Sequence, residues 1–489
     1  MRNTYPQANE EIARSGCLTR VGKSLSVLAL LPGVFGAAAY AAADGDHNID
    51  GATAYIIEPY RAGADALGGW LADTKDTFVS SDGSAAGTGK KPDSSATATT
   101  ETPPLIIIPS ASATTTSTET ATMAPSTDCE QKLAALPNST LIENVITWPV
   151  SGDGTSYYGD LNTAETIAFV RSHKFGGLLI ASKVTNPEAV KEILKPENYT
   201  NDPIVMVDDE GRLVNRMPED GSGPAFPNAS EMGTMTNEQV AAIAKNRAQL
   251  LKGFYVDAAL APVTDVPPQD GSVTGIEAFR FFGKTPDVVA EKAGVYGSAL
   301  KKAGVNPVYK HFAGGSQVTR EGKHSDYGVA YTGDIETLKS WDLQVFEGKN
   351  GKNLAVTDGR TGVMMGNYVV GGGFTHNKPA SVDPTMYELA KENGFQFITT
   401  DDLGAPGVNQ PLSQSLVEAW QAGATLPLFV QNTVDPDKTA EEQLQSIINR
   451  AKATMTTEPT FRQQLLGAIK ANATFVGKTT CEIASDLEK

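Results

Sequence analysis

The sequence has little cysteine and a deficit of positive charge, and both shortages narrow the class of protein. Only three of the 489 residues are cysteine, which excludes a disulfide-dense scaffold, and no C-x-x-C pair or histidine-rich cluster indicates a structural zinc site. Lysine and arginine number 40 against 57 acidic residues, so the formal net charge is −17. A chain this acidic is not expected to bind nucleic acid or an anionic membrane surface. We expect partners that are neutral or small.

The N-terminal region carries an apolar stretch that predicts export. Residues 24–43 contain no charged side chain and end in Ala-Ala-Ala before Asp44. This pattern is typical of a secretory signal with an Ala-x-Ala cleavage site. An uncleaved N-terminal anchor is the alternative, because about 20 apolar residues can span a bilayer. Under either interpretation of residues 1–43 the rest of the chain leaves the cytoplasm, and the only membrane contact we expect is through this segment if it is retained as an anchor.

The next regions predict a linker and then one large domain. Residues 82–128 are dominated by Ser, Thr, Ala and Pro and contain no aromatic residue, which is typical of a disordered linker. Residues 44–81 form a short region to which we assign no role. The folded domain is expected at 129–489. Cys129 and Cys481 lie near its two ends, so in an oxidising compartment they could form one disulfide, with two free thiols as the alternative.

Within this domain, short apolar runs alternate with segments of helical periodicity that often end at glycine. Eight such alternations predict an α/β fold, specifically a (β/α)8 TIM-type barrel. A doubly wound open sheet is the alternative, but no G-x-G-x-x-G follows any of the runs. The runs expected to form strands are 144–148, 176–182, 203–208, 254–262, 306–312, 361–367, 394–402 and 425–432.

Polar residues stand where four of these runs end, where a buried strand should not end in charge. In a barrel of this type the carboxyl ends of the strands meet at one site, so we expect these side chains to lie close together. A lone strand-end aspartate is explained as easily by an ion pair or a helix cap, but a set on four strands favours a functional site. The residues are Asp208, Lys310, His311, Asn367, Asp401 and Asp402.

Several ordered segments resemble glycoside hydrolase family 3, specifically its single-domain β-N-acetylglucosaminidases. The sequence VDDEGRLVNR at 207–216 is similar to the family's D-x-E-G-G-x-V-x-R, and LAPVTDV at 260–266 to its F-A-P-V-x-D-V. FRFFGKTPDVVAE at 279–291 resembles R-S-F-G-x-D-P, and KHF at 310–312 resembles the start of K-H-F-P-G-H-G. TTDDL at 399–403 is similar to S/T-D-D-L, whose first aspartate is the family's nucleophile.

The resemblance implies roles for individual residues. Asp401 would attack the anomeric carbon and form a covalent glycosyl-enzyme intermediate. Charged side chains would hold the sugar hydroxyls, and the resemblance places Asp208, Arg280, Lys310 and His311 in that role. We expect Asp402 to give structural support beside the nucleophile and Asp265 to order a loop.

The acid/base residue is expected on the loop after the fifth strand. The family carries a histidine there in a D-S-H sequence, and this chain has Glu-Gly-Lys-His from Glu321 to His324 instead. The resemblance implies that His324 shuttles the proton, with Glu321 or Asp326 as its partner. The alternative is that His324 is an ordinary exposed loop histidine. For His173 and His376, which belong to no motif, we expect solvated side chains.

Together these observations predict an exported retaining exo-β-N-acetylglucosaminidase that removes terminal GlcNAc from peptidoglycan-derived glycans or muropeptides. One alternative is another exo-β-glycosidase, such as a β-glucosidase, and a second is a catalytically inactive barrel that binds cell-wall glycan. No cofactor or metal is implied, because a nucleophile and an acid/base suffice for glycoside cleavage. We expect a monomer.

Overall fold

The computed structural model describes the domain in segments. They are residues 128–151, 164–218, 225–271, 278–316, 329–331, 333–347, 354, 358–370, 374–376, 378–405, 408–430 and 434–489. All of them belong to one compact unit, Ser117–Lys489. The predicted signal or anchor (1–43), the region 44–81, nearly all of the linker 82–128, and the loop residues Glu321 and His324 lie outside the described residues.

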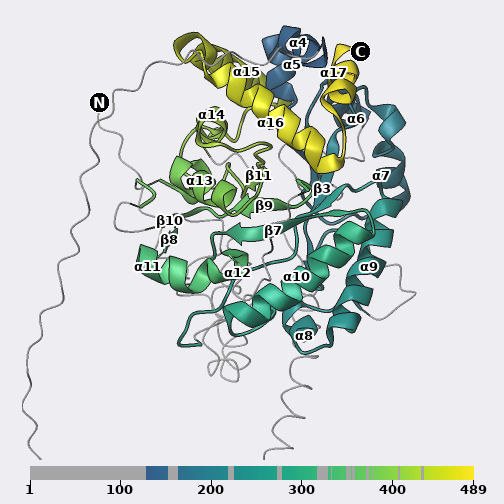
Figure 1. The fold of residues 1–489 in the computed structure, drawn as a ribbon. Helices are drawn as coiled ribbons and strands as arrows, with labels where there is room; N and C mark the ends of the chain where they lie inside the picture. Colours follow the sequence, from purple (N-terminus) through teal and green to yellow (C-terminus); the bar gives the residue numbers. More distant parts are fainter. Residues whose placement is uncertain are drawn as a thin grey trace, which may run out of the picture. The chain divides into compact units, whose positions relative to one another are not determined.

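The centre of the molecule is a curled parallel sheet surrounded by helices (Figure 1). Its order β1-β2-β3-β6-β7-β9-β11 follows the chain order of these strands, and every pairing between them is parallel. A doubly wound sheet would instead reverse its order at a switch point. The strands are β1 (Thr147–Val150), β2 (Gly177–Ile180), β3 (Ile204–Val207), β6 (Ala258–Ala259), β7 (Asn306–Phe312), β9 (Gly362–Met365) and β11 (Phe397–Thr400).

Seven of the eight runs expected to be strands therefore contribute to the sheet, and the eighth contributes differently. Residues 425–428 lie between the two edge strands: the Thr425 amide donates to Ile398 of β11 at 2.8 Å, and Leu428 forms a parallel bridge with Thr147 of β1. No regular strand forms there, and Pro427 gives a physical reason, because proline has no N–H to donate to a ladder. The prediction of a regular eighth strand is wrong, whereas the α/β class and the curled parallel sheet are confirmed.

Helices follow the strands and cover the outer face of the sheet. Those between successive strands are α6 (Ala164–Ser172), α7 (Pro187–Ile193), α8 (Ala229–Gly233), α9 (Asn237–Gly253), α10 (Pro286–Lys302), α11 (Ile335–Thr337), α12 (Gln344–Glu347) and α13 (Pro384–Glu392). A π-helical turn, Leu338–Asp342, joins α11 to α12, and α14 (Leu412–Ala422) follows β11. Two small strand pairs accompany the sheet: β4 (Asp209–Gly211) with β5 (Val214–Asn215), and β8 (Val329–Tyr331) with β10 (Tyr368–Val370).

The strands alternate between two apolar clusters, as the period of two requires. On β3, Ile204 and Met206 point into an inner cluster, while Val205 and Val207 face the helices. Phe397 of β11 stacks inside the sheet on Phe475, with ring centroids 3.8 Å apart. The inner positions are therefore filled by side chains, which leaves the strand ends as the place for chemistry.

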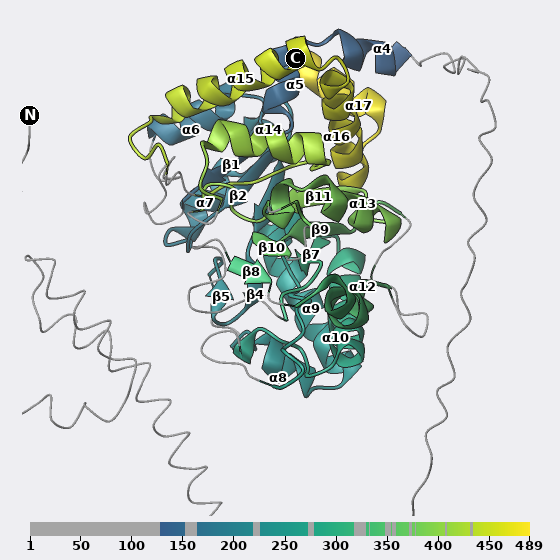
Figure 2. The same ribbon diagram turned by 90° about the vertical axis from the view of Figure 1, so that its left-hand side faces the viewer.

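The two ends of the described chain lie on the same side of the molecule (Figure 2). The N-terminal helices α4 (Asp128–Ala135) and α5 (Asn138–Glu143) pack there with the C-terminal helices. A disulfide joins Cys129 of α4 to Cys481 of α17, as the sequence allowed, so the free-thiol alternative is wrong. The C-terminal helices are α15 (Ala440–Thr457), α16 (Phe461–Val476) and α17 (Thr480–Glu488).

Removing this disulfide is expected to destabilise the domain. The bridge closes a loop of 352 residues, and a cross-link over so long a loop restricts the unfolded chain strongly. The double variant Cys129→Ser/Cys481→Ser should lose about 2–5 kcal/mol of unfolding free energy, measured by urea denaturation. A reductant should lower the urea midpoint of the wild type to that of the variant, and should not change the midpoint of the variant. Equal midpoints for the oxidised wild type and the variant would contradict this prediction.

Candidate active site

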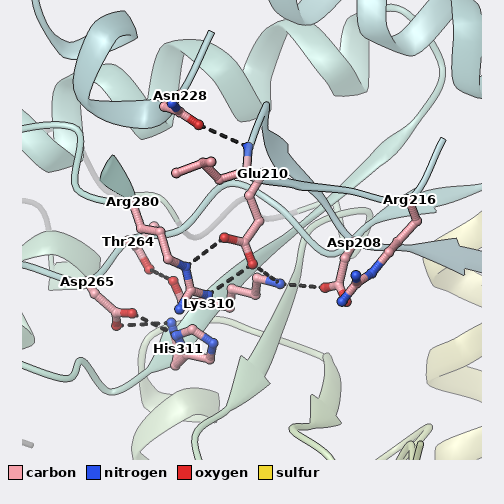
Figure 3. A network of polar contacts seen from close by, with 10 residues as sticks. Asp208, Glu210, Arg216, Asn228, Thr264, Asp265, Arg280, Lys310 and His311 are labelled. Atoms are coloured by element: carbon pink, nitrogen blue, oxygen red, sulfur yellow. Dashed lines mark hydrogen bonds and ion pairs between the residues drawn. The ribbon is translucent and has the colours of Figure 1, made fainter. Parts of the chain in front are cut away.

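Two of the predicted strand-end residues meet in a charged cluster at the carboxyl ends of β3 and β7 (Figure 3). The Lys310 ammonium lies 2.6 Å from Asp208 Oδ1 and 2.7 Å from Glu210 Oε1. Its side chain is only 4% exposed, whereas that of Asp208 is 22% exposed. Burial alone lowers the pKa of Lys310, but the two carboxylates outweigh it and raise this pKa above its usual value. The ammonium therefore stays charged although it is buried.

Arg280 joins the same cluster through Glu210. Its Nε and Nη2 donate to the two oxygens of Glu210 at 2.8 and 3.0 Å, which is a bidentate pair. The Glu210 side chain is 5% exposed. Burial by itself favours the neutral acid, but Arg280 and Lys310 hold the pKa of Glu210 well below its usual range. Arg280, which we expected to hold sugar hydroxyls, has much of its hydrogen-bonding capacity committed to a carboxylate.

His311 forms a second buried pair beside this cluster. Its Nδ1 donates to Asp265 Oδ2 at 2.7 Å, and its backbone amide donates to Asp265 Oδ1 at 3.2 Å. Burial opposes protonation, yet the Asp265 carboxylate, with a smaller contribution from Asp401, raises the pKa of His311 above its usual value. Asp265 therefore orients the imidazole and favours its protonated form, which is a more specific role than the expected ordering of a loop.

The two aspartates after β11 have different surroundings. Asp402 is buried, and its Oδ1 accepts hydrogen bonds from the amides of Gly404 at 2.9 Å and Val430 at 2.8 Å. These bonds agree with the expected structural role. Asp401 is partly exposed, its amide donates to Met365 of β9, and its Oδ1 accepts from the Asp402 amide at 2.8 Å. Asp401 is the carboxylate of this pair that is open to solvent.

A buried carboxylate holds the residues on both sides of 317–328, the segment that contains Glu321 and His324. Asp342 accepts hydrogen bonds from the Ser316 amide at 2.8 Å, the Ser316 hydroxyl at 2.6 Å and the Tyr331 hydroxyl at 2.7 Å. Burial raises the pKa of Asp342 to about 6 in spite of these donors. The two predicted loop residues themselves lie outside the described residues.

The raised pKa of Asp342 has a consequence for stability. A carboxyl that binds its proton more tightly when folded stabilises the protein below its unfolded pKa, and this stabilisation is lost as pH rises through the folded value. Replacing Asp342 by asparagine removes the titration. The stability of Asp342→Asn relative to wild type should therefore rise by about 2–3 kcal/mol between about pH 4 and about pH 7. Urea unfolding at the two pH values measures this change, and a constant difference would refute the prediction.

Sequence reasoning missed Glu210 and gave no role to Arg216, whose Nη2 lies 3.9 Å from Asp208 Oδ2. Both lie in the VDDEGRLVNR segment. The period of two in an extended chain could have identified Glu210, because residues two apart share a face. Asp209 points the other way and pairs with buried Arg247 through Nε at 3.0 Å.

The two histidines outside the motifs have different surroundings. His173 is mostly buried rather than solvated: its side chain is 18% exposed and packs against Phe169 and Phe175. His376 is 65% exposed, as expected, but its Nδ1 lies 2.8 Å from Asp383 Oδ2. Among the residues that the structure describes, no group of three or more potential ligands is arranged to hold a metal ion. In the same part of the chain, no helix is both long and apolar enough to cross a bilayer.

The arrangement can bind a polar, hydroxyl-rich ligand and present a carboxylate to it. The cations are fixed by buried partners, so they need little reorganisation when a ligand arrives. Asp208 and Asp401 remain partly exposed beside them. Of the predicted site residues, the structure brings Asp208, Arg280, Lys310 and His311 together, and the charge of Asp401 acts on His311.

Comparison with known proteins identifies the family of the domain. Residues 150–465 match the family described as "Glycosyl hydrolase family 3 N terminal domain". Beta-hexosaminidase LpqI of Mycobacterium tuberculosis is 30% identical over 288 residues, which cover 56% of this chain and 70% of LpqI.

Solved structures share the fold. The structure of M. tuberculosis LpqI superimposes with a TM-score of 0.59 and 26% identity, covering 72% of this chain and 97% of that chain. A beta-N-acetylhexosaminidase from Beutenbergia cavernae gives a TM-score of 0.57 and 22% identity, covering 70% of this chain and 99% of the other. At that identity the second likeness concerns the fold alone.

Proposed function

Since this chain belongs to glycoside hydrolase family 3 and is a glycosidase acting on O-glycosyl bonds, we propose that it is an exported, retaining exo-β-N-acetylglucosaminidase. Its substrates are GlcNAc-containing glycans, above all muropeptides and other peptidoglycan fragments. The observation that carries the proposal is partly exposed Asp401, whose amide binds Met365 of β9, next to the strand β7 that supplies the buried ion pairs of Lys310 and His311. A relative named beta-hexosaminidase supports the proposal that the sugar removed is an acetamido sugar.

Asp401 is the nucleophile. A retaining glycosidase needs an ionised carboxylate that reaches the anomeric carbon and leaves a covalent glycosyl-enzyme intermediate, which water then hydrolyses. The bond from the Asp402 amide to Asp401 Oδ1 fixes the orientation of this carboxylate.

The terminal sugar is held by the charged cluster. Asp208 accepts hydrogen bonds from sugar hydroxyls, while Lys310 and His311 donate to sugar oxygens. The ion pairs hold these side chains in place before substrate binds, so the entropic cost of ordering them is met on folding rather than in the Michaelis complex. Arg280 contributes chiefly by fixing Glu210, which in turn fixes Lys310.

Proton transfer is assigned to the loop after β7. His324 protonates the leaving oxygen and then activates water, with Glu321 as its partner. The bonds from Ser316 and Tyr331 to Asp342, on either side of that segment, support a loop whose ends are held in fixed positions.

Turnover of chromogenic substrates by the full-length protein tests this proposal. We expect release of 4-nitrophenol from the β-N-acetylglucosaminide and much slower release from the β-glucoside. His324→Ala should lower the rate on the acetamido sugar, and azide should partly restore it by replacing the attacking water. A faster reaction on the glucoside would identify a β-glucosidase instead. No turnover on either sugar, with muropeptide binding intact by calorimetry, would identify a glycan-binding relative.

A further inference from the structure

His376 is held at the tip of a turn by a buried carboxylate. The Lys378 amide donates to the Thr375 carbonyl at 2.7 Å, which closes the turn around His376. His376 has a φ of 50°, a left-handed conformation that costs a non-glycine residue free energy. Its Nδ1 lies 2.8 Å from Oδ2 of Asp383, which is 0% exposed, while its own side chain is 65% exposed. A strained backbone and a buried partner together fix one exposed imidazole.

This pair belongs to the carboxyl edge of the sheet, where the site lies. Ser381, two residues before Asp383, donates to Asn367 Oδ1 at 2.5 Å. Asn367, which follows β9, donates through Nδ2 to the Asp402 carbonyl at 2.6 Å. The turn is thus connected to the residue next to Asp401 by hydrogen bonds and by the short backbone segment from Ser381 to Asp383. The connection that carries His376 follows β9 and β10, so it belongs to the rim of this carboxyl edge. The His376 ring is exposed there, whereas Lys310 and His311 are buried.

We propose that His376, oriented by Asp383, binds the leaving-group sugar of the substrate. When Nδ1–H is bound to Asp383, Nε2 of the neutral ring is free to accept a hydrogen bond from a sugar hydroxyl, and the protonated ring donates one to a sugar oxygen. An exo-acting enzyme buries only the terminal sugar, so the leaving-group sugar extends towards the rim. This inference rests on the proposed function and adds to it the recognition of a second sugar.

Two substrates that differ only in the leaving group test the contact. N,N′-diacetylchitobiose has a sugar there, and 4-nitrophenyl β-N-acetylglucosaminide has an aromatic ring without hydroxyls like those of a sugar. In the full-length protein, His376→Asn should lower kcat/KM for diacetylchitobiose about three- to tenfold, through KM, and change the nitrophenyl reaction less than about twofold. Asparagine tolerates the left-handed φ, so the turn is retained.

Control variants separate this role from a structural one. Asp383→Asn keeps an acceptor for the Thr385 amide, which Asp383 Oδ1 binds at 2.9 Å, but no longer holds the imidazole proton, so it should reproduce the KM effect. His173 lies before the amino end of β2, so His173→Asn should leave kcat/KM unchanged for both substrates. If His376→Asn lost kcat/KM equally on both substrates, or kept the wild-type kcat/KM on diacetylchitobiose, the proposal would be overturned.

Failure of the proposed enzymatic function can be distinguished from failure of the His376 contact. If the wild type cleaves neither substrate, the enzymatic proposal fails, and the contact is then judged by calorimetry. Diacetylchitobiose should bind His376→Asn more weakly than it binds the wild type, while GlcNAc alone binds both equally. Equal affinities for diacetylchitobiose would overturn the contact in this case too.

Discussion

Replacing Asp401 by asparagine should reduce turnover of the acetamido substrate by at least about a thousandfold. The amide keeps the shape of the side chain and can still accept the hydrogen bond from the Asp402 amide at 2.8 Å. It cannot form the glycosyl-enzyme intermediate, because a neutral amide oxygen is a poor nucleophile. The measurement is kcat/KM for the nitrophenyl β-N-acetylglucosaminide, with the unfolding free energy of the variant determined alongside.

The matched control is Asp358→Asn. Asp358 is exposed, precedes the amino end of β9, away from the carboxyl ends of the strands, and pairs with Lys301 at 2.8 Å. Loss of such a surface pair costs at most about 1 kcal/mol of stability and should leave turnover unchanged. If Asp401→Asn retained more than about a tenth of the wild-type activity, Asp401 would not be the nucleophile.

Replacing Glu210 by glutamine should destabilise the domain by about 3–5 kcal/mol, because it leaves two buried cations short of negative charge. Arg280 and Lys310 both bind Glu210 within 3.0 Å. Turnover should fall as well, since Lys310 loses one of the two carboxylates that fix its position. Urea unfolding at neutral pH measures the loss of stability, and kcat/KM measures the loss of positioning.

The pH dependence and a surface control distinguish this effect from a general loss of packing. The depressed pKa of Glu210 means that its stabilising contribution is present above its unfolded pKa and is lost as pH falls towards the folded value. The difference in unfolding free energy between wild type and Glu210→Gln should therefore become smaller as the pH is lowered. Glu130→Gln breaks an exposed pair with Lys470 and should cost at most about 1 kcal/mol. If Glu210→Gln and Glu130→Gln lost similar amounts of unfolding free energy, the account would be contradicted.

Much of the fold was predictable because the strands are short, apolar and bounded by turn residues. β2, β3, β7, β9 and β11 all lie within the predicted runs. The eighth run failed as a regular strand because Pro427 interrupts its ladder, a local effect that its apolar pattern conceals.

The site was predictable where charge ends a strand, as at Asp208 and at Lys310 with His311. The pairing of Glu210 with Arg280 was not, because these residues are 70 positions apart in the chain. Periodicity places Glu210 on the face of Asp208 but does not identify its partner. The His376–Asp383 pair was missed for a similar reason, since it depends on a turn and a left-handed backbone that the sequence GGGFTHNK does not specify.

Trapping the intermediate tests the central claim most directly. The full-length protein is incubated with a 5-fluoro derivative of N-acetylglucosaminyl fluoride, which slows hydrolysis of the glycosyl-enzyme, and is then digested and examined by mass spectrometry. The account predicts one added fluorinated acetamido sugar per chain, on the peptide that contains Asp401, and no adduct in Asp401→Asn. An adduct on another residue, or substrate turnover without any covalent adduct, would contradict it.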